Sequence, residues 1–336
     1  MRITVVASMR NEGPFIVEWV AWYRMLGFSD VVVVTNNSTD HSPALLDALQ
    51  TAGWVHHIRH DLPPGKLITR AKLKAARGHR AVFRADWVMV CDVDEFLVIH
   101  RGAGRIGDLI DLSANPPPFL GMSINWRVFG TSGLTAFEDV PVHRQFVYAN
   151  AVGSALSRSA KSIFRKPRLF AAMGEHGPTG FDVTAAGGDG AAGIRWVNSS
   201  GQTLPRWKPD GKFVSKLPAT VTTHAVAQLN HYMLRSEETF SLKRGTRSPV
   251  ALSDRYKQSY FDAADKGTEL DASAFRYAEA FDEIYARAMA LPDVARLHAL
   301  CCADHVRAIR ETAGQRAEDD PRYHAHLAQA QAAPGG

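Results

Sequence analysis

The stretch WVMVCDVDEFLVI most constrains what this chain can fold into. Its first half, residues 87–91, is an apolar run that fits a strand buried on both faces of a parallel sheet. Three carboxylates follow, Asp92, Asp94 and Glu95, and then a second apolar run, 96–99. Closely spaced carboxylates repel one another unless water or a cation lies between them. The pattern therefore predicts an acidic turn at the carboxyl end of a buried strand.

Two interpretations of this turn are open. Most acidic clusters in soluble proteins are solvated surface turns, but the apolar runs on both sides argue against that interpretation here. Open α/β sheets bind ligands at the carboxyl ends of their strands. Mn²⁺ and Mg²⁺ prefer one or two protein carboxylates together with the oxygens of a substrate phosphate. The favoured hypothesis is a site for Mn²⁺ or Mg²⁺ at Asp92 and Asp94.

Composition limits the class of protein. The chain has 336 residues, 46% of them hydrophobic and 22% charged, as is ordinary for a soluble globular protein. Cys91, Cys301 and Cys302 cannot form a disulfide framework and include no Cys-x-x-Cys pair, so we expect a reducing compartment and no zinc site of the usual spacing. No apolar run reaches the roughly 18 residues of a membrane span. We therefore expect a cytoplasmic protein.

The net charge excludes few of the possible binding partners. A formal charge of +5 and a pI near 9.1 suit a phosphate-bearing substrate or peripheral contact with the anionic inner face of a membrane. Charge alone does not choose between these two. The sequence has no zinc-finger or RNA-binding signature, so we expect no nucleic-acid partner. The sequence leaves the oligomeric state undetermined.

The first hundred residues alternate between strand and helix patterns. Such alternation is typical of a parallel sheet with helices on both faces, and a nucleotide-binding half-domain is its default form. The sequence predicts strands at 3–9, 30–35, 54–60 and 87–91, and helices at 14–26, 43–49 and 66–84.

The rest of the chain is less regular. We predict two strands at 120–129 and 142–148 and a basic segment at 157–169. Loops or a small hairpin are expected after residue 178, up to about 216, followed by a last strand at 221–233 and helices at 236–242 and 272–313. The organisation expected from these patterns is an α/β domain over 1–250, a helical extension over 251–324 and a frayed tail over 325–336.

Three segments resemble the family-2-like glycosyltransferases of bacteria and, behind them, the family-92 enzymes. They are MRNEGPFIVEWVAWYRMLGFSDVVVVTNNSTDHS, the DVDEF stretch and LNHYMLRSEETFSLKRG. The resemblance covers about residues 1–250 and implies the GT-A fold, a Rossmann-like, mixed but mainly parallel sheet flanked by helices. It also implies transfer of a hexose from a nucleotide-sugar, usually a UDP-sugar, to a hydroxyl of a glycan or lipid-linked acceptor in polysaccharide synthesis.

The resemblance further implies a metal shell and phosphate contacts. In these enzymes a histidine late in the sequence often completes the coordination of the metal, and His231 has the matching position, beside Asp92 and Asp94 as the other ligands. It could instead be a partly buried strand histidine. Breaking the sugar–diphosphate bond leaves negative charge on the nucleotide, which a metal and nearby cations would stabilise. Lys243 and Arg244 are placed for that role, or simply follow a helix C-terminus that favours cations.

Further donor contacts are expected at the carboxyl ends of the first two strands and near the start of the third helix. Each of these residues could equally be a turn residue, a helix cap or a solvated charge. The donor-binding set is Asn11, Glu12, Asn37, Asp40, Arg70, Asp92, Lys243 and Arg244.

A catalytic base is required if the reaction inverts the anomeric centre. Inverting family-2 enzymes usually show an Asp in a Glu-Asp pair, and the pair in this region, at Glu138 and Asp139, lies early in the chain. Glu175 and His176 stand where the base is expected. The base is therefore left open among Glu175, His176 and Asp139.

Other functions remain open. A nucleotidyltransferase would also combine carboxylates, metal and nucleotide, but would normally carry a glycine-rich basic loop after the first strand, and RNEG is not one. A dehalogenase-type phosphatase would place Asp-x-Asp after the first strand rather than the fourth. A binding protein with the same fold and no turnover is the non-enzymatic alternative.

Overall fold

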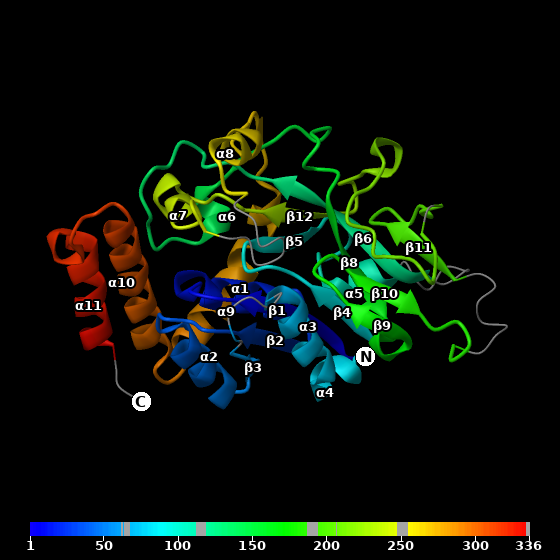
Figure 1. Cartoon of the computed structure of the whole chain (residues 1–336), viewed down its shortest axis with the longest axis horizontal. Helices are drawn as coiled ribbons and strands as arrows, with labels where there is room; N and C mark the ends of the chain where they lie inside the picture. Colours follow the sequence, from blue (N-terminus) through cyan, green and yellow to red (C-terminus); the bar gives the residue numbers. More distant parts are fainter. Residues whose placement is uncertain are drawn as a thin grey trace.

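The computed structural model describes residues 1–61, 63, 68–111, 119–186, 194–205, 207–246 and 255–333. Within these residues a mixed sheet of nine strands forms the centre, with the order β3-β2-β1-β4-β8-β6-β12-β5 and with β11 paired to β6 (Figure 1). The strands are β1 (Ile3–Met9), β2 (Asp30–Thr35), β3 (His56–Arg59), β4 (Trp87–Val90), β5 (Glu95–Ile99), β6 (Phe119–Val128), β8 (Ala160–Arg165), β11 (Arg195–Asn198) and β12 (Ala227–His231).

Helices cover both faces of this sheet. The C-terminal pair α10 and α11 lies at one end of the molecule, and the hairpin of β9 (Phe170–Met173) and β10 (Pro178–Phe181) lies toward the other (Figure 1). The helices are α1 (Gly13–Met25), α2 (Ser42–Thr51), α3 (Ile68–Gly78), α4 (Arg80–Phe83), α5 (Ile106–Ile110), α6 (Val142–Gln145), α7 (Glu237–Ser241), α8 (Gln258–Ala264), α9 (Ala278–Met289), α10 (Val294–Thr312) and α11 (Pro321–Ala332).

The apolar strands explain the two layers. Strands β1, β2, β3 and β4 run parallel, so alternate residues of each strand face opposite layers. Val5 joins the core under α1, α2, α9 and α10, whereas Val6 joins the core under α3 and α4. The predicted mixed, mainly parallel sheet flanked by helices is thus confirmed.

One strand turns the sheet from parallel to mixed. β8 runs antiparallel between β4 and β6, and β12 pairs parallel with β6 and antiparallel with β5. The sequence analysis treated 157–169 only as a basic segment and missed β8. Charged Lys161 and Arg165 interrupt its apolar pattern, and Lys161 is nevertheless buried.

Two other expectations were wrong in part. The predicted strand at 142–148 is instead α6 followed by the short β7 (Tyr148–Ala149). The tail expected to fray from residue 325 is helical to Ala332, because α11 packs against α10.

The expected domain boundary at 250/251 falls outside the described residues. No described helix combines the length and the apolar character that a bilayer span requires.

Candidate functional site

Helix α1 holds the acidic turn through its aromatic face. Trp19 donates from Nε1 to the carbonyl oxygen of Asp92 at 3.0 Å, and the Tyr23 hydroxyl donates to the carbonyl oxygen of Glu95 at 3.0 Å. The turn is closed by the backbone N–H of Asp92, which donates to a Glu95 carboxylate oxygen at 2.8 Å. Helical spacing places both aromatic side chains on one face of α1, so the helix fixes where the carboxylates emerge.

Lys161 of β8 holds two of the three carboxylates. Its ammonium lies 2.8 Å from an oxygen of Asp92 and 3.3 Å from an oxygen of Glu95. Lys161 and Glu95 are buried, whereas the side chain of Asp92 is 45% exposed. Burial would lower the pKa of Lys161, but the charges of Asp92 and Glu95 outweigh it and raise that pKa. The sequence analysis assigned no role to either Lys161 or Glu95.

Burial of Glu95 makes a testable contribution to the pH dependence of stability. Desolvation, only partly offset by the charge of Lys161, raises the pKa of Glu95 from 4.5 to about 7. The folded state therefore retains a proton that the unfolded state loses, and stability falls as pH rises between these two values. Glu95→Gln lacks this titration. Its free energy of unfolding minus that of wild type should therefore increase by about 3 kcal/mol as the pH rises from about 4.5 to about 8.

Urea unfolding of both proteins across this pH range checks the prediction. Glu283→Gln is a matched control, because the Glu283 side chain is 72% exposed. A gap between Glu95→Gln and wild type that does not change with pH would contradict the argument.

Asp94 faces a histidine and a lysine from two segments late in the chain. One carboxylate oxygen lies 3.4 Å from Nε2 of His231 at the end of β12, and the other lies 3.4 Å from the Lys243 ammonium after α7. Burial would raise the pKa of Asp94, but the charges of His231 and Lys243 hold it well below its usual range. Asp94, His231 and Lys243 thus meet as the sequence analysis expected.

Arg235 is a cation that the sequence analysis missed. It has a left-handed backbone conformation, with φ of 57°, and its buried guanidinium stacks 3.4 Å from the ring centre of Phe15. The same guanidinium donates to Glu12 at 2.8 Å, and its charge also lowers the pKa of Asp94. It therefore ties α1 to the segment after β12.

The carboxyl ends of β1 and β2 are joined by their turn residues. Asn11 accepts from the backbone N–H of Thr39 at 2.8 Å and donates to the Thr39 hydroxyl at 3.0 Å. Asp40 accepts from the Ser42 hydroxyl at 2.6 Å, and it also accepts from the N–H of Gly13 at the start of α1. Asn37 takes a left-handed conformation beside these contacts and binds Asp61 through its N–H. The turn and cap roles that the sequence left open are therefore present.

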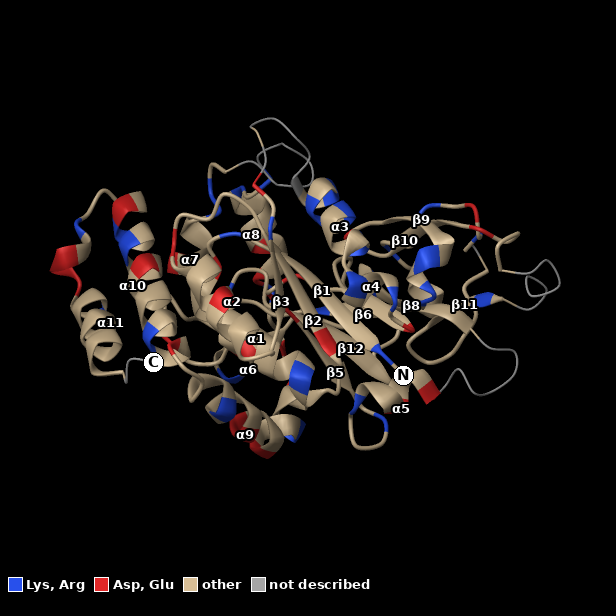
Figure 2. Ribbon diagram, turned by 90° about the horizontal axis from the view of Figure 1, so that it is seen from below, with Lys and Arg blue, Asp and Glu red and all other residues tan. Residues whose placement is uncertain are grey.

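The basic helix α3 brings one lysine to this edge. Lys72 is buried and donates to the carbonyl oxygen of Met9 at the end of β1. Burial lowers its pKa to about 8, against the charge of Asp92. Arg70, which was the predicted contact, is exposed on α3, where Figure 2 shows several basic residues together. The structure thus favours Lys72 over Arg70.

Helix α8 and Arg255, three residues before it, belong to the same electrostatic environment. Desolvation would lower the pKa of Arg255, but Tyr256 and Tyr260 raise it, and the charge of Asp92 adds a smaller contribution in the same direction. Desolvation raises the pKa of Tyr260, and the charges of Asp94 and Asp92 add to it. Arg244 stacks on Phe240 and donates to Gln258 of α8, so these contacts direct it to α7 and α8 rather than to Asp94.

His176 reaches the acidic turn from the loop between β9 and β10. Its Nδ1 donates to the carbonyl oxygen of Ala160 at 2.8 Å, so Nε2 keeps the lone pair of the neutral ring. Burial and then the charge of Lys161 lower its pKa. Glu175 is half-buried next to it, and its charge acts on His176 in the opposite direction. The charge of Asp92 also acts on His176, so His176 lies within electrostatic range of the acidic turn.

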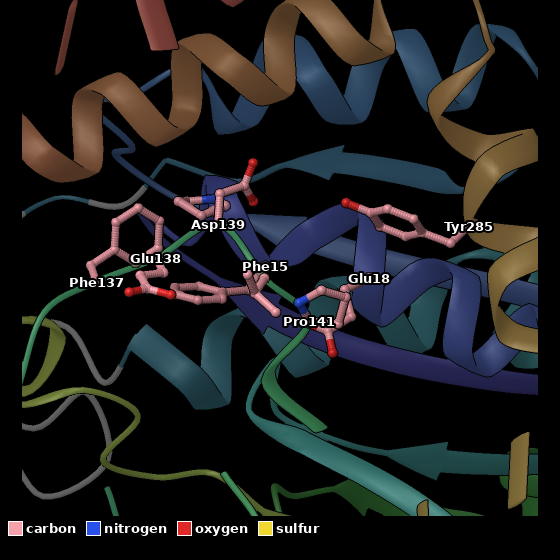
Figure 3. A pocket seen from close by; sticks show the side chains of 9 residues that line it. Phe15, Glu18, Phe137, Glu138, Asp139, Pro141 and Tyr285 are labelled. Carbon is pink, nitrogen blue, oxygen red and sulfur yellow. The ribbon is translucent and has the colours of Figure 1, made fainter. Parts of the chain in front are cut away.

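Asp139 lies in a different environment. Its carboxylate points toward α10 in Figure 3 and accepts from Nε2 of His298 at 3.0 Å. Burial would raise its pKa, but the hydrogen bond and charge of His298 lower it. The contacts of Asp139 thus belong to the C-terminal helices rather than to β4, β8 and β12, where the other predicted catalytic residues meet.

Comparison with known proteins identifies the family. The family model of glycosyltransferase family 92 matches residues 5–186. A glycosyltransferase family 92 protein of Ricinus communis is 26% identical over 130 residues, which span 39% of this chain and 23% of that protein. The chain thus matches about a quarter of the length of this curated relative.

Solved structures give weaker similarity. Staphylococcus aureus TarS residues 1–349 is 12% identical with a TM-score of 0.33, over 98% of this chain and 88% of TarS. Glucosyl-3-phosphoglycerate synthase of Mycobacterium tuberculosis, in a complex with Mn²⁺, UDP and glucosyl-3-phosphoglycerate, is 18% identical with a TM-score of 0.31, over 59% and 69% of the two chains.

The family match extends from β1 to the loop that follows β10, and so includes the acidic turn, β8 and His176. It confirms the resemblance stated from the sequence, and the mixed, mainly parallel sheet is the GT-A architecture that the resemblance implied. Because the match covers more than half of its residues, the chain belongs to glycosyltransferase family 92.

Proposed function

We propose that this glycosyltransferase moves a hexose from a UDP-sugar to a hydroxyl of a glycan or lipid-linked acceptor, with Mn²⁺ or Mg²⁺ held at the acidic turn. The observation that carries the proposal is Asp94, a buried and ionised carboxylate that faces His231 and Lys243 from remote segments. An ionised carboxylate is costly to bury unless cations surround it. Here Lys243 and Arg235 supply positive charge, where the diphosphate of a donor would bind in an open α/β sheet.

The donor atoms of this site fit a hard divalent cation. Asp94 and His231 supply one oxygen and one ring nitrogen that already face each other, and Asp92 keeps one carboxylate oxygen clear of Lys161. When bound, the ion would stabilise negative charge on the departing diphosphate. Lys161 would fix the rotamer of Asp92, and Lys243 would place its ammonium beside the phosphates.

The donor nucleotide is proposed to bind at the ends of β1 and β2. Asn11, Asn37 and Asp40 shape the loop there, and Glu12 is held by Arg235. Lys72 adds a buried cation next to the carbonyl of Met9. These contacts support a preformed nucleotide site with its phosphates directed toward the acidic turn.

His176 is the proposed catalytic base. Its ring is oriented by Ala160, it is neutral at physiological pH, and its unprotonated Nε2 can accept the acceptor's proton. Glu175 is the neighbouring alternative. Asp139 is a poorer choice because its carboxylate is already bound by His298.

Nucleotide binding in the presence of Mn²⁺ tests the donor class. A ligand at a hundred times its Kd stabilises the folded state by about 2.7 kcal/mol. We expect UDP and UDP-sugars with Mn²⁺ to raise the melting temperature more than GDP, ADP or CDP do, and EDTA to abolish the shift. Equal shifts for all nucleotides, or none, would contradict the UDP assignment. Release of pyrophosphate from UTP and a sugar phosphate would instead indicate a nucleotidyltransferase.

A further inference from the structure

A second cluster of metal-ligating side chains lies away from the acidic turn. Asp139, Cys302 and His326 each offer one ligand atom, and these atoms lie within 4.8 Å of one another. The three residues come from the loop before α6, from α10 and from α11. Cys302 is fully buried, His326 is 8% exposed, and the side chain of Asp139 is 32% exposed. The mechanism proposed above uses none of them.

His298 completes the cluster as a fourth potential ligand. Its Nε2 lies 3.0 Å from a carboxylate oxygen of Asp139 and 3.7 Å from Sγ of Cys302. In a tetrahedral zinc site, neighbouring N and O ligands are about 3.4 Å apart and N and S ligands about 3.6 Å apart. His298 and Cys302 are four residues apart on α10, so helical spacing places both on one face. These two separations are therefore close to those around a bound Zn²⁺.

The cluster also contains an orienting contact and an unsatisfied group. Nδ1 of His326 lies 3.0 Å from the amide oxygen of Gln329, which can only accept. Nδ1 therefore carries the proton and Nε2 keeps a lone pair, as in histidines that ligate metals. On His298, Nδ1 is buried without a hydrogen-bond partner among the described residues. When Nε2 binds an ion, the proton that it donates to Asp139 must therefore move to Nδ1, the tautomer that leaves the Nε2 lone pair free for the ion.

We propose that Asp139, Cys302 and His326, with His298 as the fourth ligand, bind a structural Zn²⁺ that fastens α10 and α11 to the loop before α6. A thiolate with imidazoles and one carboxylate suits Zn²⁺ rather than the Mn²⁺ or Mg²⁺ of the acidic turn. Binding exchanges the thiol proton of Cys302 for a sulfur–zinc bond, and the proton passes to solvent. The ligands come from three separate segments of the sequence, so a short zinc-binding motif does not reveal the site.

Metal analysis of the full chain tests the proposal. Protein purified from zinc-supplemented medium and dialysed against metal-free buffer should retain one zinc per chain, and Cys302→Ser should lose it. Replacement of zinc by Co²⁺ should give a thiolate-to-cobalt charge-transfer band in wild type and none in Cys302→Ser. Stripping the zinc should lower the melting temperature of wild type by several degrees and leave that of Cys302→Ser unchanged.

The neighbouring cysteine provides a matched control. Cys301 is equally buried but packs against Gly13, so Cys301→Ser should retain the zinc and the cobalt band. His326→Gln is a second test if Cys302→Ser does not fold, and it should also lose zinc. Asp94→Asn should keep it, which separates this site from the acidic turn. Wild type without zinc, or equal zinc in Cys301→Ser and Cys302→Ser, would show that the cluster is only a hydrogen-bonded contact.

Discussion

Asp94→Asn is expected to lower kcat/KM for UDP-sugar turnover by about 10²–10³-fold, comparable to the loss of one electrostatic contact made in a transition state. Asparagine keeps the shape of aspartate and one acceptor oxygen, but it removes the negative charge that His231 and Lys243 surround. The charge is present in the wild type at all physiological pH values, because the cations hold the pKa of Asp94 well below its usual range. Affinity for Mn²⁺ should fall together with activity.

Initial rates of UDP-sugar hydrolysis and calorimetric titration of Mn²⁺ in the presence of UDP check this expectation. Asp86→Asn is a matched control at the opposite end of β4, where the carboxylate binds the N–H of Arg2. That variant should keep wild-type activity and metal affinity. Asp94→Asn with intact Mn²⁺ binding and turnover would remove the acidic turn from the proposed site.

Strands β1, β2 and β4 could be predicted because each is a mainly apolar run, whereas β3 (HHIR) is polar and shorter than the 54–60 expected. Valine runs between polar turns give β1, β2 and β4 almost to the residue, and helix α1 follows from aromatic residues at helical spacing. The acidic turn was likewise visible, because charge directly after a buried strand is unusual. In these segments the local sequence pattern alone indicates the secondary structure that is found in the folded chain.

The missing parts of the site depend on partners that are distant in sequence. Lys161 interrupts the apolar pattern of β8, so periodicity does not reveal that strand. The lysine can be buried because the carboxylates of Asp92 and Glu95 pair with its charge. Arg235 likewise becomes part of the site through Glu12 and Phe15, more than two hundred residues earlier. A basic residue is expected at the solvent-exposed surface unless an acidic side chain pairs with it in the interior. The sequence alone does not show such a pair when the two residues are far apart in the chain.

His176→Ala is expected to lower kcat for sugar transfer by about 10²–10⁴-fold while the KM for the donor stays within a few-fold of wild type. The ring would act on the acceptor hydroxyl, so its loss should affect the chemical step and not nucleotide binding. Burial and the charge of Lys161 lower the pKa of His176 from 6.5. Wild-type kcat should therefore rise with pH only up to a value below 6.5 and stay level through neutral pH, since the neutral ring is the active form.

Glu175→Gln and a pH profile of each variant distinguish this assignment from its alternatives. If His176 is the base, Glu175→Gln should retain most of the activity and the acidic limb of the profile, with that limb shifted slightly downward because Glu175 helps to raise the pKa of His176. His176→Ala should lose the limb along with the rate. The opposite pattern would make Glu175 the base. If both variants turn over normally, neither residue is the base. Asp139→Asn then separates the last candidate base from transfer with retention of configuration, in which the departing diphosphate takes the acceptor's proton.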